Sequence, residues 1–456
     1  MSATVLRAGL AMLAAMILAA AASAAEETVF RDVAVIDVLS GEVRPGHDVR
    51  VRADKIVAVT PSSAQPPTQV RIVAGAGRFL IPGLAEMHAH VPPPAEQRAR
   101  GEQLLRLYVA NGVTTIRGML GAPWHLDLRK DIEAGRVLGP RFFAGAPSLN
   151  GNSAPDPQTA ERLVREYASA GFDFLKLHPG LKREVFDAIV RTAREVRIPF
   201  GGHVSENVGI EHALAARQQA VDHLDGYLNA LADPQCRMRR AAGFFGIGLT
   251  DCMDESRIPA LVKLTLEAGT WNVPTQSLLD KFAAPPASVE ALRAWPEMRY
   301  MPAQTADNWM NARGNFLGSQ SLSPQLMARF IGMRRALLRA LDAAGAPLLV
   351  GADSPQIFNV PGFATHDELA SLVRAGISPR AALQAATVNP ARLFGREARF
   401  GTIAPGKDAD LVLLEANPLA DIAATRRIAG VMLRGKWLDR AELDRQLKEV
   451  CVGPGC

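Results

Sequence analysis

The chain lacks the features that mark nucleic-acid-binding proteins and integral membrane proteins. It has no basic stripe interleaved with aromatic residues: its 51 Lys and Arg residues stand against 46 Asp and Glu, and the basic ones are scattered singly or in pairs. Nucleic-acid binding is therefore not expected. Beyond one apolar run near the start, no segment is long and apolar enough to cross a membrane. The composition otherwise fits an ordinary globular protein.

Cysteine is also scarce. The four cysteines all lie in the second half of the chain: Cys236, Cys252, Cys451 and Cys456. Their spacing is not that of a zinc knuckle. We expect structural disulfides, and two local pairs are the simplest arrangement, although four cysteines allow three connectivities.

The first 25 residues have the pattern of a secretory signal peptide. Arg7 supplies a positive start, residues 8–22 are apolar and rich in alanine, and Ala22-Ser23-Ala24 supplies small residues at the cleavage site. A membrane-spanning anchor would need about 20 strongly apolar residues. We therefore predict that residues 1–25 are cleaved, that the protein is exported to the periplasm or outside the cell, and that it has no membrane partner afterwards.

Two β-rich regions lie at opposite ends of the chain, at residues 28–75 and 401–436. Both contain runs of β-branched residues, and turns such as Ser40-Gly41 punctuate the first of them. We predict a small β-sandwich domain built from residues 26–78 and 396–445, with a C-terminal tail at 446–456.

The region between them, 79–395, alternates strand-like and helix-like patterns, which predicts an α/β fold with a parallel sheet. A TIM (β/α)8 barrel with insertions accommodates these units. A doubly wound sheet is disfavoured because Gly75 and Gly77 precede a strand and do not open a helix. Residues 277–345 exceed a normal βα connection, so we predict a helical insertion over the barrel mouth. The strand candidates are 79–90, 113–117, 141–144, 172–177, 198–203, 220–223, 270–274 and 347–353.

Candidate metal ligands close several of these strands. The first apolar run ends in His88 and His90, whose i, i+2 spacing places both imidazoles on one face of a strand. Further candidates close later runs in the same way: Lys176, His203, His223 and Asp353. The carboxyl ends of barrel strands are where active sites of this fold are built. The pattern predicts a metal centre and a metal-dependent hydrolase.

Lys176 and Asp353 have distinct expected roles. An ammonium group among cations is unfavourable, but carboxylation by CO2 would turn Lys176 into an anionic carbamate able to bridge two ions. The alternative is a buried lysine neutralised by desolvation. Asp353 is predicted to be both a ligand and the acid–base catalyst that takes a proton from metal-bound water. Proton transfer to a carboxylate is feasible there because a metal lowers the pKa of bound water from 15.7 to roughly 7.

These residues resemble the amidohydrolase superfamily, in its prolidase-like and imidazolonepropionase-like branch. The resemblance rests on Ile81-Pro82-Gly83-Leu84 leading to His88 and His90, and on further motifs along the chain: 112–117, 174–176, 223–227, 351–353, 383–391 and 401–411. It implies a TIM barrel with a β-sandwich and two divalent ions, usually zinc. By the resemblance, His88, His90 and Asp353 hold one ion, His203 and His223 hold the other, and carboxylated Lys176 bridges them.

Some positions depart from the family pattern or have weaker assignments. Asp222 stands where Glu is frequent before the histidine of strand six, and Gly118-Met119 replaces a common aspartate. Tyr227 and Arg117 are candidates for substrate binding, with a structural tyrosine and a supporting ion pair as the alternatives. The remaining histidines singled out are not expected to be ligands: His125, His178, His212 and His366.

The sequence therefore predicts an exported binuclear amidohydrolase that cleaves a C–N bond in a small molecule, such as a dipeptide or an N-acyl amino acid. Esterase, lactonase or phosphotriesterase activity is the nearest alternative, because the same attacking hydroxide serves each of them. A non-catalytic binding protein on this scaffold would have lost a ligand, whereas all six are present. A homo-oligomer is left open.

Overall fold

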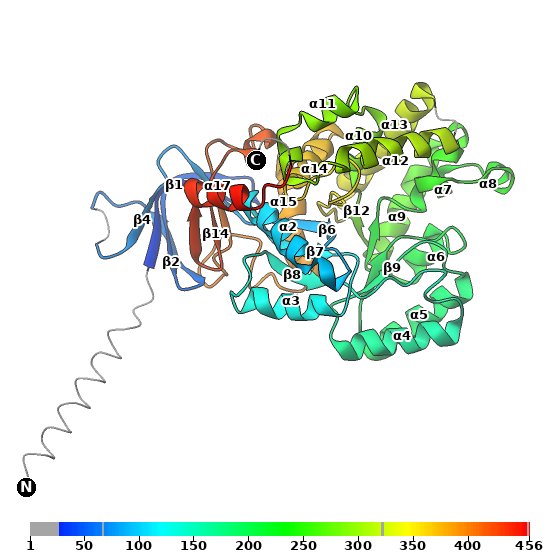
Figure 1. Ribbon diagram of the computed structural model, residues 1–456, viewed down its shortest axis with the longest axis horizontal. Coiled ribbons are helices and arrows are strands. Elements are labelled where there is room, and N and C mark those ends of the chain that lie inside the picture. Colours follow the sequence, from blue (N-terminus) through cyan, green and yellow to red (C-terminus); the bar gives the residue numbers. More distant parts are fainter. Residues whose placement is uncertain (1–26, 66–67, 321–322, 454–455) are drawn as a thin grey trace, which may run out of the picture.

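The computed structural model describes residues 27–65, 68–320, 323–453 and 456. The predicted signal peptide lies outside this part of the chain. The described residues form a mixed β-sheet and an α/β barrel that lie side by side, and strands from both ends of the chain belong to the sheet (Figure 1).

The sheet combines both ends of the chain, as predicted. Its strand order is β15-β14-β13-β5-β1-β2-β3, and β4 pairs with β1. A separate core of β-branched and aromatic side chains supports it, including Phe30 and Trp437 with ring centroids 5.1 Å apart. The strands are β1 (Glu27–Ile36), β2 (Val43–Arg52), β3 (Lys55–Pro61), β4 (Arg71–Ala74), β5 (Phe79–Pro82), β13 (Leu411–Leu414), β14 (Ile428–Leu433) and β15 (Lys436–Asp439).

The run 79–90, predicted as one strand, is divided between the two parts. β5 belongs to the mixed sheet, whereas β6 (Leu84–Ala89) is the first strand of the barrel. Gly83 lies between them, and a Cβ at this position would stand 2.0 Å from the Oγ1 of Thr114. Only glycine allows this close approach, so the barrel strand begins after residue 83 and not at residue 79.

Seven regular strands of the barrel run parallel. They are β6, β7 (Val113–Gly118), β8 (Arg141–Ala144), β9 (Leu175–Leu177), β10 (Phe200–Gly202), β11 (Ala220–Asp222) and β12 (Trp271–Val273). They form ladders of three and four strands. Single parallel bridges join the two ladders, from Gly145 to Phe174 and from Leu149 to Leu177.

The predicted eighth strand, 347–353, closes the ring without forming a regular strand. Leu348 bridges Asn272 on one side, and Ser354 bridges Ala89 on the other. The N–H of Met87 also donates to the carbonyl of Val350 at 2.8 Å. The backbone leaves the extended conformation at Asp353, whose φ is 60°. The TIM-barrel prediction is therefore confirmed, with an irregular last strand that ends at a predicted ligand.

Helices surround the barrel, and those with an apolar stripe bury it against the strands. α5 buries Val185, Phe186 and Ile189, and α4 is capped by Asp156 and ends at Gly171 with φ 89°. The helices outside the insertion are α2 (Arg98–Ala110), α3 (Trp124–Glu133), α4 (Pro157–Ala170), α5 (Arg183–Val196), α6 (Ile210–Ala215), α7 (Tyr227–Leu231), α8 (Pro234–Arg239), α9 (Ile258–Ala268), α14 (Phe363–Arg374), α15 (Pro379–Ala386), α16 (Val388–Leu393) and α17 (Arg440–Glu449), with short 3-10 helices η1 (Ala95–Gln97), η2 (Phe244–Cys252), η3 (Glu255–Arg257) and η5 (Ile422–Arg426).

The long connection before residue 347 is helical, as predicted. It contains α10 (Gln276–Ala283), α11 (Val289–Arg293), η4 (Pro296–Tyr300), α12 (Thr305–Gln320) and α13 (Pro324–Ala343). Its apolar side chains share a buried cluster with α2 and with the loop after Asp353, through Leu104, Leu292 and Phe358. The insertion is thus packed against the loop that carries a predicted ligand.

Both predicted local disulfides are present. Cys236–Cys252 ties α8 to η2 with a Cα–Cα distance of 6.4 Å, and Cys451–Cys456 closes the tail with 5.6 Å. The N–H groups of Val452 and Gly453 anchor this tail on the carbonyl of Arg299 in η4. None of the helices in the described ranges is long and apolar enough to cross a membrane.

Candidate metal centre

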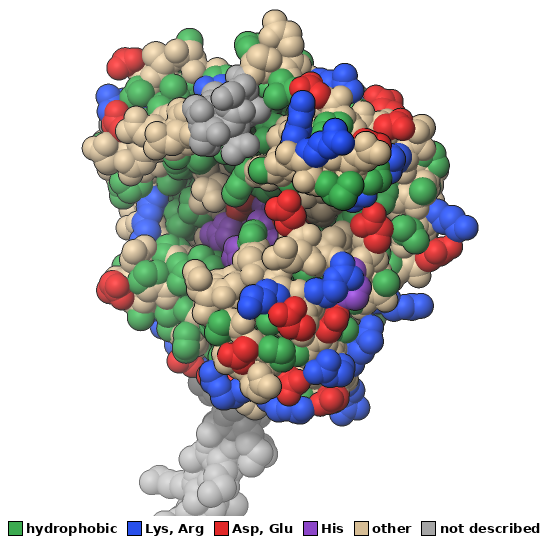
Figure 2. All heavy atoms as spheres, turned by 90° about the vertical axis from the view of Figure 1, so that its right-hand side faces the viewer, with side chains coloured by type: hydrophobic (Ala, Val, Ile, Leu, Met, Phe, Trp, Pro, Cys, Tyr) green, Lys and Arg blue, Asp and Glu red, His purple; other side chains and the backbone are tan. Residues whose placement is uncertain are grey.

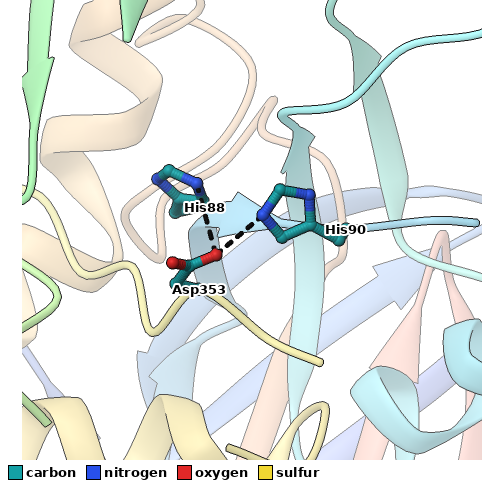
Figure 3. Close-up of side chains that lie close together, drawn as sticks. All are labelled: His88, His90 and Asp353. Atoms are coloured by element: carbon teal, nitrogen blue, oxygen red, sulfur yellow. Dashed lines mark hydrogen bonds and ion pairs between the residues drawn. The ribbon is translucent and has the colours of Figure 1, made fainter. Parts of the chain in front are cut away.

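The first group of predicted ligands lies where β6 meets the irregular eighth strand (Figure 3). The Nε2 atom of His90 is 2.7 Å from the Oδ1 atom of Asp353, and the Nε2 atom of His88 is 3.5 Å from the same oxygen. The side chain of His88 is 2% exposed and that of His90 is 19% exposed. A cation entering from the His90 side would meet two imidazoles and one carboxylate.

A second group shares His88 and extends across the barrel. The Nδ1 atom of His88 is 3.3 Å from the Oδ2 atom of Asp222, and the rings of His88 and His223 have centroids 4.7 Å apart. The ring of His203 follows at 4.6 Å from that of His223. The histidines therefore form a continuous row across the carboxyl ends of the strands, as their positions in the sequence predict.

Lys176 joins the same cluster through Asp222. Its Nζ atom donates to the Oδ2 atom of Asp222 at 2.8 Å, and both side chains are fully buried. Arg117 approaches the other oxygen of Asp222 at 3.5 Å. Burial alone would raise the pKa of Asp222, but Lys176 and Arg117 hold it below the usual value, while burial lowers the pKa of Lys176. The structure thus brings all six predicted ligands into one cluster, in which Asp222, an aspartate that the sequence analysis did not assign, contacts Lys176 and His88.

The donor set fits divalent metal ions. Burial lowers the pKa of His88 and His223 well below the usual value, and neighbouring cationic groups lower it further. These imidazoles are therefore neutral, which is the form that binds metals. Among the described residues, the buried Nδ1 atom of His88 faces the Oδ2 atom of Asp222 at 3.3 Å without forming a hydrogen bond. A buried nitrogen that makes no hydrogen bond is expected where a ligand completes the site.

Neighbouring side chains orient His203 and His223. The Nδ1 atom of His203 is 2.6 Å from the Oδ2 atom of Asp225, and the Nδ1 atom of His223 is 2.8 Å from the Oγ1 atom of Thr275. These partners leave the Nε2 atom of each ring available to a metal. Carboxylate and hydroxyl partners of this kind fix the tautomer of metal-binding histidines.

Comparison with known proteins decides the family. A model described as the amidohydrolase family matches residues 79–438. The chain belongs to the amidohydrolase family. The resemblance seen in the sequence motifs is thereby confirmed.

Its relatives within the family are distant. The chain is 21% identical over 397 residues to an adenine deaminase from Moorella thermoacetica, covering 85% of this chain and 54% of that protein. It thus spans about half the length of the adenine deaminases it matches. It is 23% identical to ochratoxinase from Aspergillus niger, with 82% of this chain and 78% of that protein covered. For imidazolonepropionase from Rubrobacter xylanophilus the identity is 25%, with 82% and 86% covered.

Solved structures of amidohydrolases share the fold. A Xaa-Pro dipeptidase with bound methionine matches 91% of this chain and all of its own, with 20% identity and a TM-score of 0.66. Bottromycin amidohydrolase matches 93% of this chain and 91% of its own, with 26% identity and a TM-score of 0.68. The barrel and the mixed sheet are therefore the architecture of this family.

Glu86 is a positioning residue of this amidohydrolase that the sequence analysis did not single out. It lies fully buried on β6, where its Oε1 atom accepts from the N–H of His88 and from the N–H of Ala352 at 2.6 Å. Its Oε2 atom accepts from the hydroxyl of Thr365. Burial raises its pKa to about 8. One side chain thus joins the backbone at His88 to the backbone just before Asp353, both of them candidate ligands.

Arg334 supports the opposite side of the centre. This α13 residue is fully buried, and it donates to the carbonyls of His223 and Pro274 at 2.7 Å each and to the Oε1 atom of Gln276 at 3.0 Å. A charged residue at a core position of a helix is the signal by which the sequence could have revealed it, because such burial requires specific partners.

The two predicted substrate-binding residues both lie in buried positions. The hydroxyl of Tyr227 is 2.7 Å from the Oγ1 atom of Thr265, and burial raises its pKa to about 12. Arg117 packs over the ring of Phe174 and faces Asp222. These contacts favour the structural alternative for each residue: Tyr227 supports α9, and Arg117 supplies positive charge beneath the ligand cluster.

The four histidines that were singled out but not expected to be ligands differ in their distance from the centre. The ring of His178 stacks on that of His203 with centroids 4.8 Å apart, and its Nδ1 atom is 2.6 Å from the Oγ atom of Ser148. It is thus next to the predicted ligands. The others have partners elsewhere, namely Pro92, Asp187 and Thr425 for His125, His212 and His366.

Proposed function

We propose that this protein is a metal-dependent amidohydrolase that cleaves a C–N bond in a small molecule, such as a dipeptide or an N-acyl amino acid. The observation that carries the proposal is the convergence of neutral, buried imidazoles with Asp353 and Lys176 at the carboxyl ends of the barrel strands. Family membership supports it, since amidohydrolase relatives include a Xaa-Pro dipeptidase and a bottromycin amidohydrolase.

The ligands divide into two sets with a shared member. His88, His90 and Asp353 would hold one divalent ion, and His203 and His223 would hold the other, with carboxylated Lys176 between them. Two zinc ions at these places would supply Lewis acidity toward water and toward the scissile carbonyl. Asp222 contacts both Lys176 and His88, so it lies where it can balance the positive charge of either set.

Asp353 is placed to carry the proton of the reaction. Burial alone would raise the pKa of Asp353, but its hydrogen bond to His90 and the nearby cationic groups hold it below the usual value. The carboxylate is thus available as a base at neutral pH. It would accept a proton from the attacking water and deliver it to the nitrogen of the departing amine, the general acid–base role that such a group performs.

A substrate screen tests the proposal. The protein, reconstituted with zinc in bicarbonate, would be assayed against dipeptides, N-acyl amino acids, lactones and phosphotriesters. We expect amide cleavage that is abolished by His90→Asn and by chelation. Cleavage of lactones or phosphotriesters without any amide hydrolysis would contradict the proposed reaction and favour the esterase class.

We further propose export, because residues 1–25 have the pattern of a signal peptide and two disulfides close local loops in the second half of the chain. Disulfides persist in oxidising compartments such as the periplasm or the extracellular space. Fractionation of the native host, followed by detection of the protein with an antibody, tests this localisation.

A further inference from the structure

A disulfide-closed segment lies beside the candidate metal centre. Residues 233–253 comprise α8 and η2, which project at the edge of the barrel (Figure 1). Cys236–Cys252 ties the two together, and the N–H of Asp233 donates to the carbonyl of Cys252 at 3.0 Å. This bracing fixes the position of two adjacent aromatic residues, Phe244 and Phe245.

Phe245 rests on a predicted metal ligand. Its ring centroid lies 5.1 Å from that of His223. Its φ is 56°, a left-handed conformation that costs a bulky residue roughly 1 kcal/mol or more. Gly243 and Gly246 on either side also have positive φ, of 66° and 81°. The backbone therefore adopts an unfavourable conformation at Phe245, the residue whose ring packs against the candidate centre.

A row of rings continues from Phe245 toward the helical insertion. Phe244 contacts Phe245 edge to face at 4.4 Å between centroids, and Phe316 of α12 follows at 5.8 Å. Phe282 of α10 lies 5.1 Å beyond Phe316. We call Phe244, Phe245 and Phe316 the aromatic wall. It connects the disulfide-closed segment to the insertion on the side of His223.

The protein has an open hollow above histidine side chains. On the face of the molecule opposite the mixed sheet, histidine side chains lie at the bottom of a depression that hydrophobic side chains border (Figure 2). Phe244 is 54% exposed, although its neighbours Phe245 and Phe316 are only partly exposed. Phe244 contacts Phe245, which packs on His223, so its exposed ring is a surface near the candidate centre from which a bound apolar group would remove water.

We propose that the aromatic wall selects the substrate: it binds an aromatic or large aliphatic side chain adjacent to the scissile amide. This inference rests on the proposed amidohydrolase function and names the substrate class of that site. The wall offers ring faces and edges and no charged group, so a charged or very small side chain gains nothing there. Aromatic pairs and apolar burial each favour a benzyl over a methyl group.

The test compares Phe244→Ala with a matched control, Met238→Ala. Met238 is 80% exposed, lies on the same disulfide-closed segment and is not part of the wall. The substrates would be N-acyl-phenylalanine amide and N-acyl-alanine amide, which differ only in the side chain. We expect Phe244→Ala to lower kcat/KM about tenfold for the phenylalanine substrate through KM, and to change it less than about twofold for the alanine substrate. Met238→Ala should alter neither, and both variants should keep the wild-type melting temperature.

Equilibrium binding separates this inference from the proposed reaction. Calorimetry would measure the binding of two analogues that cannot be hydrolysed, because a phosphinate replaces the scissile carbonyl and a methylene replaces the nitrogen. One analogue carries a benzyl side chain and the other a methyl side chain. Tighter binding of the benzyl analogue that is lost in Phe244→Ala would support the proposed role of the aromatic wall in binding the substrate side chain. This holds even if no amide is turned over, and in that case only the proposed reaction fails. A preference that Phe244→Ala leaves unchanged, or no preference at all, overturns the wall whether or not amides are cleaved.

Discussion

Replacement of Lys176 by alanine should separate metal binding from proton transfer in the candidate centre. The side chain is fully buried, and its Nζ atom has one charged partner, Asp222 at 2.8 Å. If Lys176 carries a carbamate, the variant loses the anion shared by two cations. Asp222 lies against the same side chain and also contacts His88, so this carboxylate can compensate for part of the loss.

The size of the effect follows from Coulomb's law. Paired metal ions in such sites lie about 3.5–4 Å apart. At an effective dielectric constant of about 20, one unit charge at 4 Å is worth on the order of 4 kcal/mol, which is about a thousandfold in a binding constant. Because Asp222 offsets part of this, we expect the second ion to bind about 10²- to 10³-fold more weakly, while the first ion is retained.

Metal analysis after dialysis, combined with turnover, measures the outcome. We expect wild type to hold two ions per chain and Lys176→Ala to hold one, with turnover falling in parallel and partly restored by acetate. The double variant Lys176→Ala with Asp222→Asn should retain less metal still. Asp353→Asn should keep much of its metal, lose roughly 10²–10⁴-fold in turnover and not respond to acetate.

Two results would refute this reasoning. If Lys176→Ala retains two ions and full activity, the carbamate assignment is wrong. If Asp353→Asn turns over normally, Asp353 is not the proton carrier and the proposed mechanism is wrong as well.

Three further predictions concern stability and processing. Burial raises the pKa of Glu368 from 4.5 to about 7, so the folded state keeps a proton that the unfolded chain releases within this window. The free energy of unfolding should therefore fall by about 3 kcal/mol as the pH rises through it, and urea titrations should show a flatter profile for Glu368→Gln. Arg334→Met leaves three buried acceptors unpaired and should cost about 3 kcal/mol or more, whereas Arg335→Met, which breaks a half-exposed pair with Asp280, should cost less than about 1 kcal/mol; equal losses in chemical unfolding would argue against the role of Arg334. Intact mass of the exported protein should show a mature chain that begins near Ala25, and a full-length mass would exclude cleavage.

The sequence was sufficient to predict the barrel and the grouping of the candidate ligands because both follow from local patterns. Each candidate ligand lies at or near the end of a short apolar run, and parallel barrel strands bring their carboxyl ends to one rim. His88 and His90 meet Asp353 although they lie far apart in sequence, since β6 and the last strand are neighbours only once the ring has closed. Periodicity and spacing carry this information without any knowledge of side-chain contacts.

The sequence did not reveal the residues that hold the ligands in place. Glu86, Asp222 and Arg334 are charged residues within apolar elements, and their roles depend on partners from distant parts of the chain. No single window contains those partners. Likewise, the division of residues 79–90 at Gly83 depends on the approach of Thr114 from β7, which no strand propensity encodes.

The arrangement of the mixed sheet determines when the protein can complete its fold during synthesis. β5 needs two neighbours, and β13, which occupies its second edge, begins only at Leu411. Until the ribosome has made that strand, the edge of β5 stays open while the entire barrel emerges. Pairing between such distant segments is slow, and an open strand edge invites aggregation. The nascent chain should therefore depend on chaperones until its last fifty residues appear, and a C-terminal truncation before β13 should yield an insoluble protein, even though every candidate metal ligand is still present.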